Sequence, residues 1–282
     1  MQNSGNLKVL TIGAVGSAAG LIVPELLKRG VSVRGFVHKA EDESVARALG
    51  LSEIVVGDLA NPLTVAEALA GMDAAFYIAP AFLKNEAEVG KQFVAAAKWA
   101  GVRRIVFSSV IHPVLLELVN HTAKIPVEDA LLNSGMEYVF LHPAMFFQNL
   151  ASSWGRAKTT GTYGEPWSAE TRFSRVDYRD VAEVAAIALT EDRLLYGTLE
   201  LCAEGNLNRN DLAALMSEVI GRAVAPVTVK LPVQGGPSTE LKHMFAWYDK
   251  HALLGNATTL RAVLGREPRT LRTYLQELNR GA

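Results

Sequence analysis

Residues 8–20, KVLTIGAVGSAAG, constrain the fold of this chain more than any other stretch. Residues 9–12 form a short apolar run that is typical of a buried parallel strand. The chain then turns at Gly13 and Gly16 and continues through small residues into an apolar helical segment. Glycine lets the backbone turn sharply and approach a ligand, and the free N–H groups at a helix start favour an anion. The spacing Gly-x-x-Gly-x-x-Ala, with Ala19 in the third small position, permits close packing of helix on strand. Taken alone, the pattern also fits a simple tight turn.

Composition narrows the class of protein. The chain has 282 residues, 49% hydrophobic and 20% charged, with a net charge of −1. This length suits one large α/β domain or one domain with an appended lobe. The small net charge gives no basic excess that would recruit nucleic acid. A single cysteine, Cys202, excludes an internal disulfide and fits a reducing compartment. Because no signal sequence and no run of roughly 20 apolar residues is present, we expect a cytoplasmic protein without a membrane partner.

Apolar runs and helix caps show that strand and helix signals alternate six times through about the first 140 residues. This alternation predicts an α/β fold, a doubly wound parallel sheet of the Rossmann type with right-handed crossovers. Asn61 followed by Pro62 predicts a sharp helix start, and Pro24 lies either in the first turn of its helix or at a kink. Strands are expected at residues 9–12, 32–37, 53–56, 74–78, 104–108 and 138–141, and helices at 21–29, 44–49, 61–70, 86–100 and 124–134.

Two cationic residues follow the second predicted strand. His38 and Lys39 lie about 20 residues past the glycines, where a dinucleotide fold reads the ribose. An acidic residue there would bond the 2′-hydroxyl of NAD, whereas cationic residues favour the 2′-phosphate of NADP. A solvated loop charge explains Lys39 equally well, so both interpretations stay open. We expect NADP(H) as the preferred cofactor, with NAD(H) possible.

Beyond residue 149 the regular alternation stops. Residues 152–172 have no clear period and predict a loop or small hairpin. A helix at 180–189 and a strand at 198–201 should return the chain to the sheet. Asn208 caps a helix to about residue 219, residues 227–231 predict an edge strand, and the pattern is helical from residue 239. We therefore predict a dinucleotide-binding domain of residues 1–151 and 176–203, and a smaller substrate-side lobe of residues 152–175 and 204–282.

The chain resembles the NmrA-like group of atypical short-chain dehydrogenases/reductases. The matching features, from about residue 8 to 275, are TIGAVGSAAG, VVGDLANP, RIVFSSVIHP, HTAKIPVEDALLNSGMEYVFLHPAMFFQN and FSRVDYRDVAEVAAIALTE. The resemblance implies a Rossmann domain that binds NAD(P), with a smaller C-terminal lobe over the nicotinamide end. Some members of this group are reductases, including quinone-reductase-like and triphenylmethane-dye reductases. Others are redox sensors that regulate a partner without turnover, and fold alone does not decide between them.

The candidate cofactor-binding residues lie mostly in the turns that follow the predicted strands. The resemblance implies that the backbone after the sixth strand contacts the nicotinamide amide. The full set is Gly13, Val15, Gly16, Ser17, Ala18, His38, Lys39, Asp58, Leu59, Ala79, Pro80, Ser108, Lys124, His142, Pro143 and Ala144.

Three candidate catalytic residues, Lys124, His121 and Ser109, precede the sixth strand. Typical short-chain enzymes use a serine and a Tyr-x-x-x-Lys pair, in which the lysine lowers the pKa of the tyrosine that protonates the substrate. The resemblance assigns the lysine to Lys124, but Asn120 replaces the tyrosine. His121, three residues before Lys124, could supply the proton or could be an exposed first-turn residue. Ser109 could bond a substrate carbonyl, bond the nicotinamide amide, or cap a turn.

Residues after the fifth and sixth strands are candidates for the substrate site, although an aromatic pair such as Phe146 and Phe147 is more often core. The set is His112, Met145, Phe146, Phe147, Asn149 and Trp154, and Trp154 could form a lid with Tyr163 and Trp167. No HxxxH, CxxC or clustered acidic spacing predicts a metal site. Nothing resembles a nucleophile elbow.

These observations predict an NAD(P)H-dependent reductase that transfers a hydride to a small apolar or aromatic electrophile. Quinones, enones, carbonyls and dye-like acceptors fit, because a quinone or conjugated dye accepts hydride without an immediate proton at the same atom. The alternative is a non-catalytic NAD(P)-sensing regulator of the NmrA type, which Asn120 fits equally well. The expected partner is a small-molecule substrate rather than nucleic acid or membrane, and the expected state is a monomer or homodimer.

Overall fold

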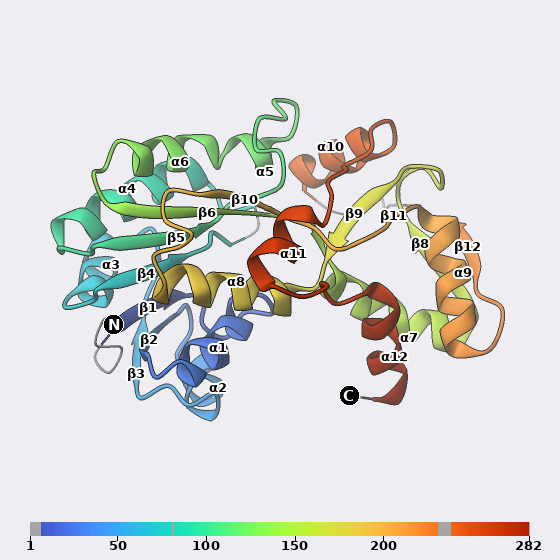
Figure 1. Ribbon diagram of the computed structural model, residues 1–282. Helices are drawn as coiled ribbons and strands as arrows, with labels where there is room; N and C mark the ends of the chain where they lie inside the picture. Colours follow the sequence, from blue (N-terminus) through green and yellow to red (C-terminus); the bar gives the residue numbers. More distant parts are fainter. Residues whose placement is uncertain (1–6, 81, 231–237, 282) are drawn as a thin grey trace. The chain divides into compact units, whose positions relative to one another are not determined.

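A computed structural model describes residues 7–80, 82–230 and 238–281 of the chain (Figure 1). Its contacts divide it into two compact units. Unit 1 comprises the residues up to Leu115, Asn120–His142 and Val181–Leu199. Unit 2 comprises Leu116–Val119, Pro143–Asp180 and the residues from Glu200 onward. The domain boundaries given above stay a prediction.

A seven-stranded sheet organises unit 1, in the order β10-β6-β5-β4-β1-β2-β3. The neighbouring strands from β6 to β3 run parallel. This order places β1 and β4 side by side at the centre, where the winding direction of a doubly wound sheet reverses. The predicted fold class is confirmed. The strands are β1 (Lys8–Ile12), β2 (Ser32–Val37), β3 (Glu53–Val56), β4 (Ala74–Tyr77), β5 (Arg104–Ser108), β6 (Glu137–Pro143) and β10 (Thr198–Leu201).

Helices cover both faces of this sheet. In Figure 1, α3, α4 and α6 lie over one face, and α1, α2 and α8 lie over the other. Pro24 is the third residue of α1, so it lies in the first turn and causes no kink. The predicted start of α3 is confirmed, because the Asn61 side chain accepts from Leu63 N at 3.0 Å. The bounds are η2 (Ala19–Leu21), α1 (Ile22–Lys28), α2 (Asp42–Ala48), α3 (Pro62–Leu69), α4 (Glu86–Trp99), α5 (Val119–Thr122), α6 (Ile125–Leu132) and α8 (Tyr178–Thr190).

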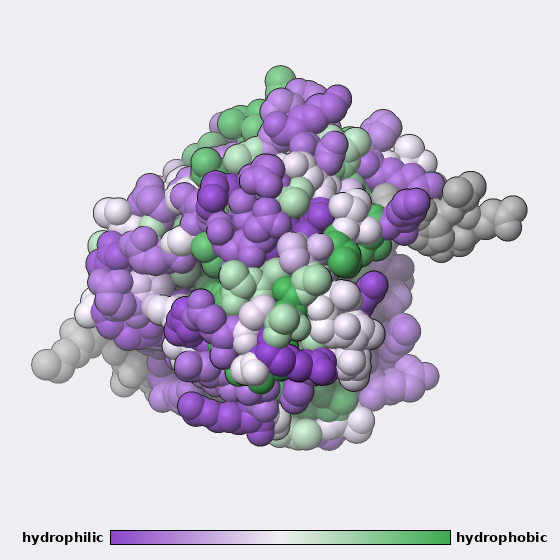
Figure 2. Space-filling view, turned by 90° about the vertical axis from the view of Figure 1, so that its right-hand side faces the viewer, coloured by the Kyte–Doolittle hydropathy of each residue, from purple (hydrophilic) through white to green (hydrophobic). Residues whose placement is uncertain are grey.

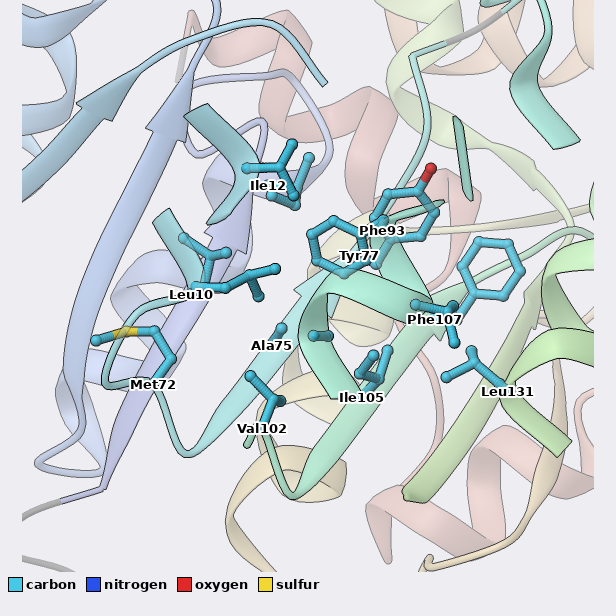
Figure 3. Close-up of a cluster of buried hydrophobic side chains, with 14 of the residues drawn as sticks. Leu10, Ile12, Met72, Ala75, Tyr77, Phe93, Val102, Ile105, Phe107 and Leu131 are labelled. Atoms are coloured by element: carbon cyan, nitrogen blue, oxygen red, sulfur yellow. The ribbon is translucent and has the colours of Figure 1, made fainter. Parts of the chain in front are cut away.

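The apolar core of unit 1 lies between the sheet and the layer of α3, α4 and α6. Figure 3 shows side chains of β1, β4 and β5 meeting Phe93 of α4 and Leu131 of α6. Tyr77 stacks on Phe93 with ring centroids 4.5 Å apart and lies 5.5 Å from the ring of Phe107. Burial of such large side chains is the main favourable term in folding. The core therefore fixes the carboxyl ends of β4 and β5, and the polar residues Ser108 and Ser109 lie at the end of β5.

Unit 2 contains two small sheets. In one, β9 (Phe173–Val176) pairs parallel with β7 (Met145–Phe146) and antiparallel with β11 (Asn206–Leu207). In the other, β8 (Thr162–Glu165) pairs parallel with β12 (Ala225–Thr228). The edge strand predicted at residues 227–231 thus begins two residues earlier, and residue 231 lies outside the described residues. The remaining elements are η3 (Phe147–Leu150), α7 (Ala151–Thr160), α9 (Arg209–Ile220), α10 (Thr239–Tyr248), α11 (Thr258–Leu264) and α12 (Leu271–Arg280).

The predicted loop or hairpin at residues 152–172 is wrong. The segment forms α7 and then β8, whose partner β12 is distant in sequence. Helix α7 has few apolar residues, but Trp154 and Ala157 lie one turn apart and both are buried. Packing of that narrow stripe stabilises a helix that propensity alone does not favour. By contrast, the predicted cap at Asn208 is confirmed as a full capping box with Asp211.

Among the described residues, no helix is both long and apolar enough to cross a membrane. Figure 2 shows one face of the protein, on which hydrophilic residues predominate and apolar residues gather only in smaller patches.

Candidate functional site

The turn after β1 has the geometry that its glycines predict. Gly13 has a φ of +67°, in the left-handed region that disfavours a side chain. Its N–H donates to Phe36 O of β2 at 3.0 Å, and Gly16 N–H donates back to Gly13 O at 2.7 Å. A Cβ atom on Gly16 would lie 3.1 Å from that same oxygen. Both glycines are therefore needed for the tight turn.

This turn presents unused hydrogen-bond donors. Among the described residues, the backbone N–H groups of Val15, Ser17 and Ala18 have no acceptor, and Ser17 is exposed. The helix start differs from the expectation, because a 3-10 turn at Ala19–Leu21 precedes α1. The donors are consequently turn amides rather than the N-terminus of the α-helix. Clustered amides of this kind suit a phosphate, so the turn fits the pyrophosphate of a dinucleotide.

The turns after β2, β3 and β4 hold the next predicted cofactor residues. His38 and Lys39 are both exposed directly after β2. Asp58 is exposed, but its carboxylate accepts from Ala60 N at 2.9 Å and closes a local turn. Leu59 and Ala79 pack against the core of unit 1, and Pro80 is exposed. All six lie at the carboxyl edge of the sheet, the edge where open α/β sheets bind ligands.

A buried polar cluster follows β5 and β6. The Ser109 hydroxyl donates to Glu128 Oε1 at 2.5 Å, and His142 Nε2 bonds the same oxygen at 2.9 Å. Ser109 and His142 are 6% and 9% exposed. Ser109 N–H also donates to Leu141 O at 2.9 Å, so the backbone of β6 holds the serine in place. Glu128 was not predicted from the sequence, although its position four residues after Lys124, on α6, is a signal that could have found it.

Lys124 lies immediately before α6 and forms an ion pair with Glu86, the first residue of α4. The side chains of Lys124 and Glu86 are 13% and 5% exposed, so the carboxylate neutralises a nearly buried ammonium group. The ammonium has three N–H groups and can donate to further acceptors. Glu86 is the second acidic residue that the sequence did not reveal.

His121 is buried, so the alternative of an exposed first-turn residue is wrong. Its Nδ1 lies 3.1 Å from His112 O, and because a carbonyl oxygen only accepts, Nδ1 carries a proton and donates it to that bond. Burial lowers the pKa of His121 to about 4. His112 itself has a φ of +50°. The role of His121 as proton donor stays a prediction. Because the proton on Nδ1 is committed to His112 O, the histidine would have to donate a second proton from Nε2.

Several predicted substrate residues belong to unit 2. Phe147 and Trp154 lie in its hydrophobic core together with Tyr163. Trp167 is 8% exposed and packs against Phe173, with ring centroids 5.4 Å apart. Because these aromatic side chains are core, the predicted lid of Trp154, Tyr163 and Trp167 is wrong. Substrate contacts of Met145, Phe146 and Asn149 stay predictions, as do the cofactor contacts of Ser108, Pro143 and Ala144.

Within the described ranges, no group of three or more His, Cys, Asp or Glu residues could hold a metal ion. Burial raises the pKa of the Cys202 thiol to about 12, which keeps it protonated at neutral pH. The polar groups described here at the carboxyl edge of the sheet are amides, a hydroxyl, carboxylates, imidazoles and the ammonium groups of Lys39 and Lys124.

Known proteins resemble this chain in sequence and in fold. The NAD(P)H azoreductase of Xenophilus azovorans is 26% identical over 94% of this chain and 96% of its own length. Quinone oxidoreductase 2 of Escherichia coli is 24% identical over 94% of this chain and 96% of its own. The crystal structure of the latter enzyme with NADPH superimposes with a TM-score of 0.84, at 21% identity, over 96% and 99% of the two chains. The NmrA-like family model matches residues 5–276. The chain therefore belongs to the NmrA-like family and has its NAD(P)-binding Rossmann-type fold.

Proposed function

We propose that this chain is an NAD(P)H-dependent reductase of a small apolar or aromatic acceptor such as a quinone, enone, carbonyl or dye. The observation that carries the proposal is that one edge of one sheet holds two complementary groups. The free amides of the glycine turn follow β1, and the Ser109–Glu128–His142 cluster joins the ends of β5 and β6, two and three strands away. With strands about 4.8 Å apart, this separation is roughly 10–15 Å, which one half of an extended dinucleotide spans.

The residues of unit 1 divide between the parts of such a cofactor. The turn amides of Val15, Ser17 and Ala18 would hold the pyrophosphate, and the exposed His38 and Lys39 would face the 2′-phosphate. The Lys124 ammonium would donate to the nicotinamide ribose while Glu86 holds it in place. When bound, the reduced cofactor supplies a hydride.

The chain's own residues support positioning more than proton transfer. Asn120 stands where the typical enzymes have tyrosine, and the one N–H of neutral His121 is committed to His112 O. Acceptors that take a hydride first and a proton later, from water, need no buried acid at the reacting atom. Holding two reactants in line supplies much of a barrier reduction by itself. The names of the azoreductase and quinone oxidoreductase relatives support this class of acceptor.

Anaerobic oxidation of NADPH, followed at 340 nm with a panel of quinones, enones, aldehydes and azo dyes, tests the proposal. We expect at least one compound of the panel to accelerate oxidation, and quinones and dyes to react faster than aldehydes, whose reduced oxygen needs a proton at once. Tight NADPH binding without acceleration by any compound would instead favour the sensing regulator.

A matched pair of variants links any turnover to the site. Gly16→Val places branched atoms against Gly13 O and should abolish both NADPH binding and turnover. Asp129→Asn changes an exposed acid on α6, next to Glu128, and should leave both intact. Turnover that survives Gly16→Val would place the reaction elsewhere.

A further inference from the structure

Glu128 receives two hydrogen bonds on a single oxygen. Both Ser109 Oγ and His142 Nε2 bond Oε1, at 2.5 and 2.9 Å. The Glu128 side chain is 16% exposed and that of His142 is 11% exposed, so little water competes for these bonds. Hydrogen bonds to an ionised acceptor are about twice as strong as neutral ones. The orientation of the Ser109 hydroxyl is therefore strongly fixed.

The direction of the Ser109 bond determines what the serine offers to a ligand. An ionised carboxylate has no proton to give, so Ser109 must be the donor in this bond. A hydroxyl has one proton and two lone pairs. With its proton committed to Glu128, the Ser109 oxygen has only acceptor capacity left. It can accept from an N–H group but cannot donate to a carbonyl oxygen.

The position of Ser109 limits which ligand group it meets. Ser109 directly follows β5, and its backbone bond to Leu141 O holds it beside the end of β6.

The order of His142, Glu128 and Ser109 also differs from that of a hydrolytic triad. Here the carboxylate lies between the serine and the histidine, so His142 does not accept the serine proton as the histidine of such a triad does. The arrangement is therefore not that of a Ser-His-Asp triad.

We propose that Glu128 is a positioning residue that fixes Ser109 as a hydrogen-bond acceptor for the carboxamide NH₂ of the nicotinamide. This inference rests on the proposed function, and it decides between the two ligands open for Ser109. The serine does not polarise a substrate carbonyl. Instead, it selects dinucleotides that carry an N–H donor on the nicotinamide side chain, and it fixes the orientation of that side chain.

Binding of two dinucleotides in the absence of any acceptor tests this inference. NADP⁺ carries the carboxamide, whereas in its 3-acetylpyridine analogue a methyl group replaces the NH₂. Calorimetry gives both dissociation constants for each variant. In the wild-type protein NADP⁺ should bind more tightly, because the methyl group leaves the Ser109 lone pairs unpaired.

Ser109→Ala should weaken NADP⁺ binding about 3- to 10-fold, the equivalent of one hydrogen bond, and leave the analogue unchanged. Glu128→Ala frees the hydroxyl to rotate and donate to the carbonyl that both ligands have, so the ratio of the two dissociation constants should fall by a similar factor. The double variant should show no further fall, because both changes act on the same bond. Asp129→Asn serves as the control and should keep the wild-type ratio.

A merely structural role for Glu128 would weaken both ligands equally and leave the ratio unchanged. That result, or an unchanged ratio in Ser109→Ala, would overturn the inference while the proposed reductase function stands. If neither dinucleotide binds to the wild-type protein, the inference and the proposed function both fail. Should Glu128→Ala not fold, Glu128→Leu gives the second reading, since its side chain fills similar space, offers Ser109 no acceptor and should also lower the ratio.

Discussion

Gly90 sets how closely α4 and α6 approach, and these helices carry Glu86 and Glu128. A Cβ atom on Gly90 would lie well inside contact distance of Val127 Cγ2 and 3.1 Å from its Cγ1. It would also lie 3.3 Å from the Tyr77 hydroxyl oxygen. Val127 is β-branched and buried, so it has little freedom to move aside. Gly90→Ala should therefore force the two helices apart.

The expected magnitude follows from two opposing contributions. Alanine in a helix interior is favoured over glycine by about 0.5–1 kcal/mol, whereas overpacking a core costs about 1–3 kcal/mol. The net destabilisation is about 0.5–2 kcal/mol, which in a chain of this size lowers Tm by roughly 1–4 °C. The matched control is Gly155→Ala, because Gly155 is also the fifth residue of its helix and a Cβ there meets nothing within 4 Å.

Thermal unfolding followed by circular dichroism measures both variants. Gly155→Ala should raise Tm by about 1–2 °C, from helix propensity alone. Gly90→Ala should lower it, and it should also weaken dinucleotide binding because α6 carries Glu128. A Tm for Gly90→Ala at or above that of the wild-type protein would refute the close helix packing described above.

Two further predictions concern the cofactor and pH. The double variant His38→Ala with Lys39→Ala should weaken NADPH binding about 10-fold or more and leave NADH binding unchanged. Lys28→Ala removes an exposed cation on α1 and should change neither affinity. Equal effects of the double variant on the two cofactors would remove the 2′-phosphate assignment. The pKa of His121 is about 4 when folded and about 6.5 when unfolded, so below pH 6.5 the unfolded chain binds the proton more readily. The contribution of neutral His121 to the free energy of unfolding should therefore be complete above pH 6.5. Up to about 3 kcal/mol of this free energy should be lost as the pH falls to 4. Urea titrations across this pH range measure the free energy of unfolding of each variant. His121→Gln should lose less of it than the wild-type protein as the pH falls, and the control His38→Gln should lose as much as the wild-type protein. Equal losses in His121→Gln and the wild-type protein would show that His121 is not the group responsible.

The fold was largely predictable because its signals are local. The strands at 53–56, 104–108 and 198–201 were found at their observed bounds, since short apolar runs between turn residues need no tertiary context. The cap at Asn61 was found for the same reason. Helix α7 was missed because its sequence, ASSWGRAKTT, forms a helix only when Trp154 and Ala157 pack into a core.

Neither acidic residue of the site was predicted, and the four-residue spacing of Glu128 from Lys124 is the one local signal that pointed to either of them. Glu128 contacts residues 19 and 14 positions away, and Glu86 contacts Lys124 from 38 positions away. In the sequence, both acids look like ordinary charges on amphipathic helices. Only the packing of α4 and α6 on the sheet brings them to the ends of β5 and β6, and that packing depends on Gly90.

A reductase must transfer a hydride from the bound dinucleotide to an acceptor. Single-turnover reduction of a triarylmethane dye with NADPH deuterated at C4 tests it most directly, because a hydride added to the central carbon of the dye does not exchange with water. We predict that mass spectrometry finds deuterium at that carbon and that dye and cofactor signals decay together. Tight NADPH binding with no dye reduction, and no oxidation by the quinones of the panel, would contradict a reductase and leave a dinucleotide sensor.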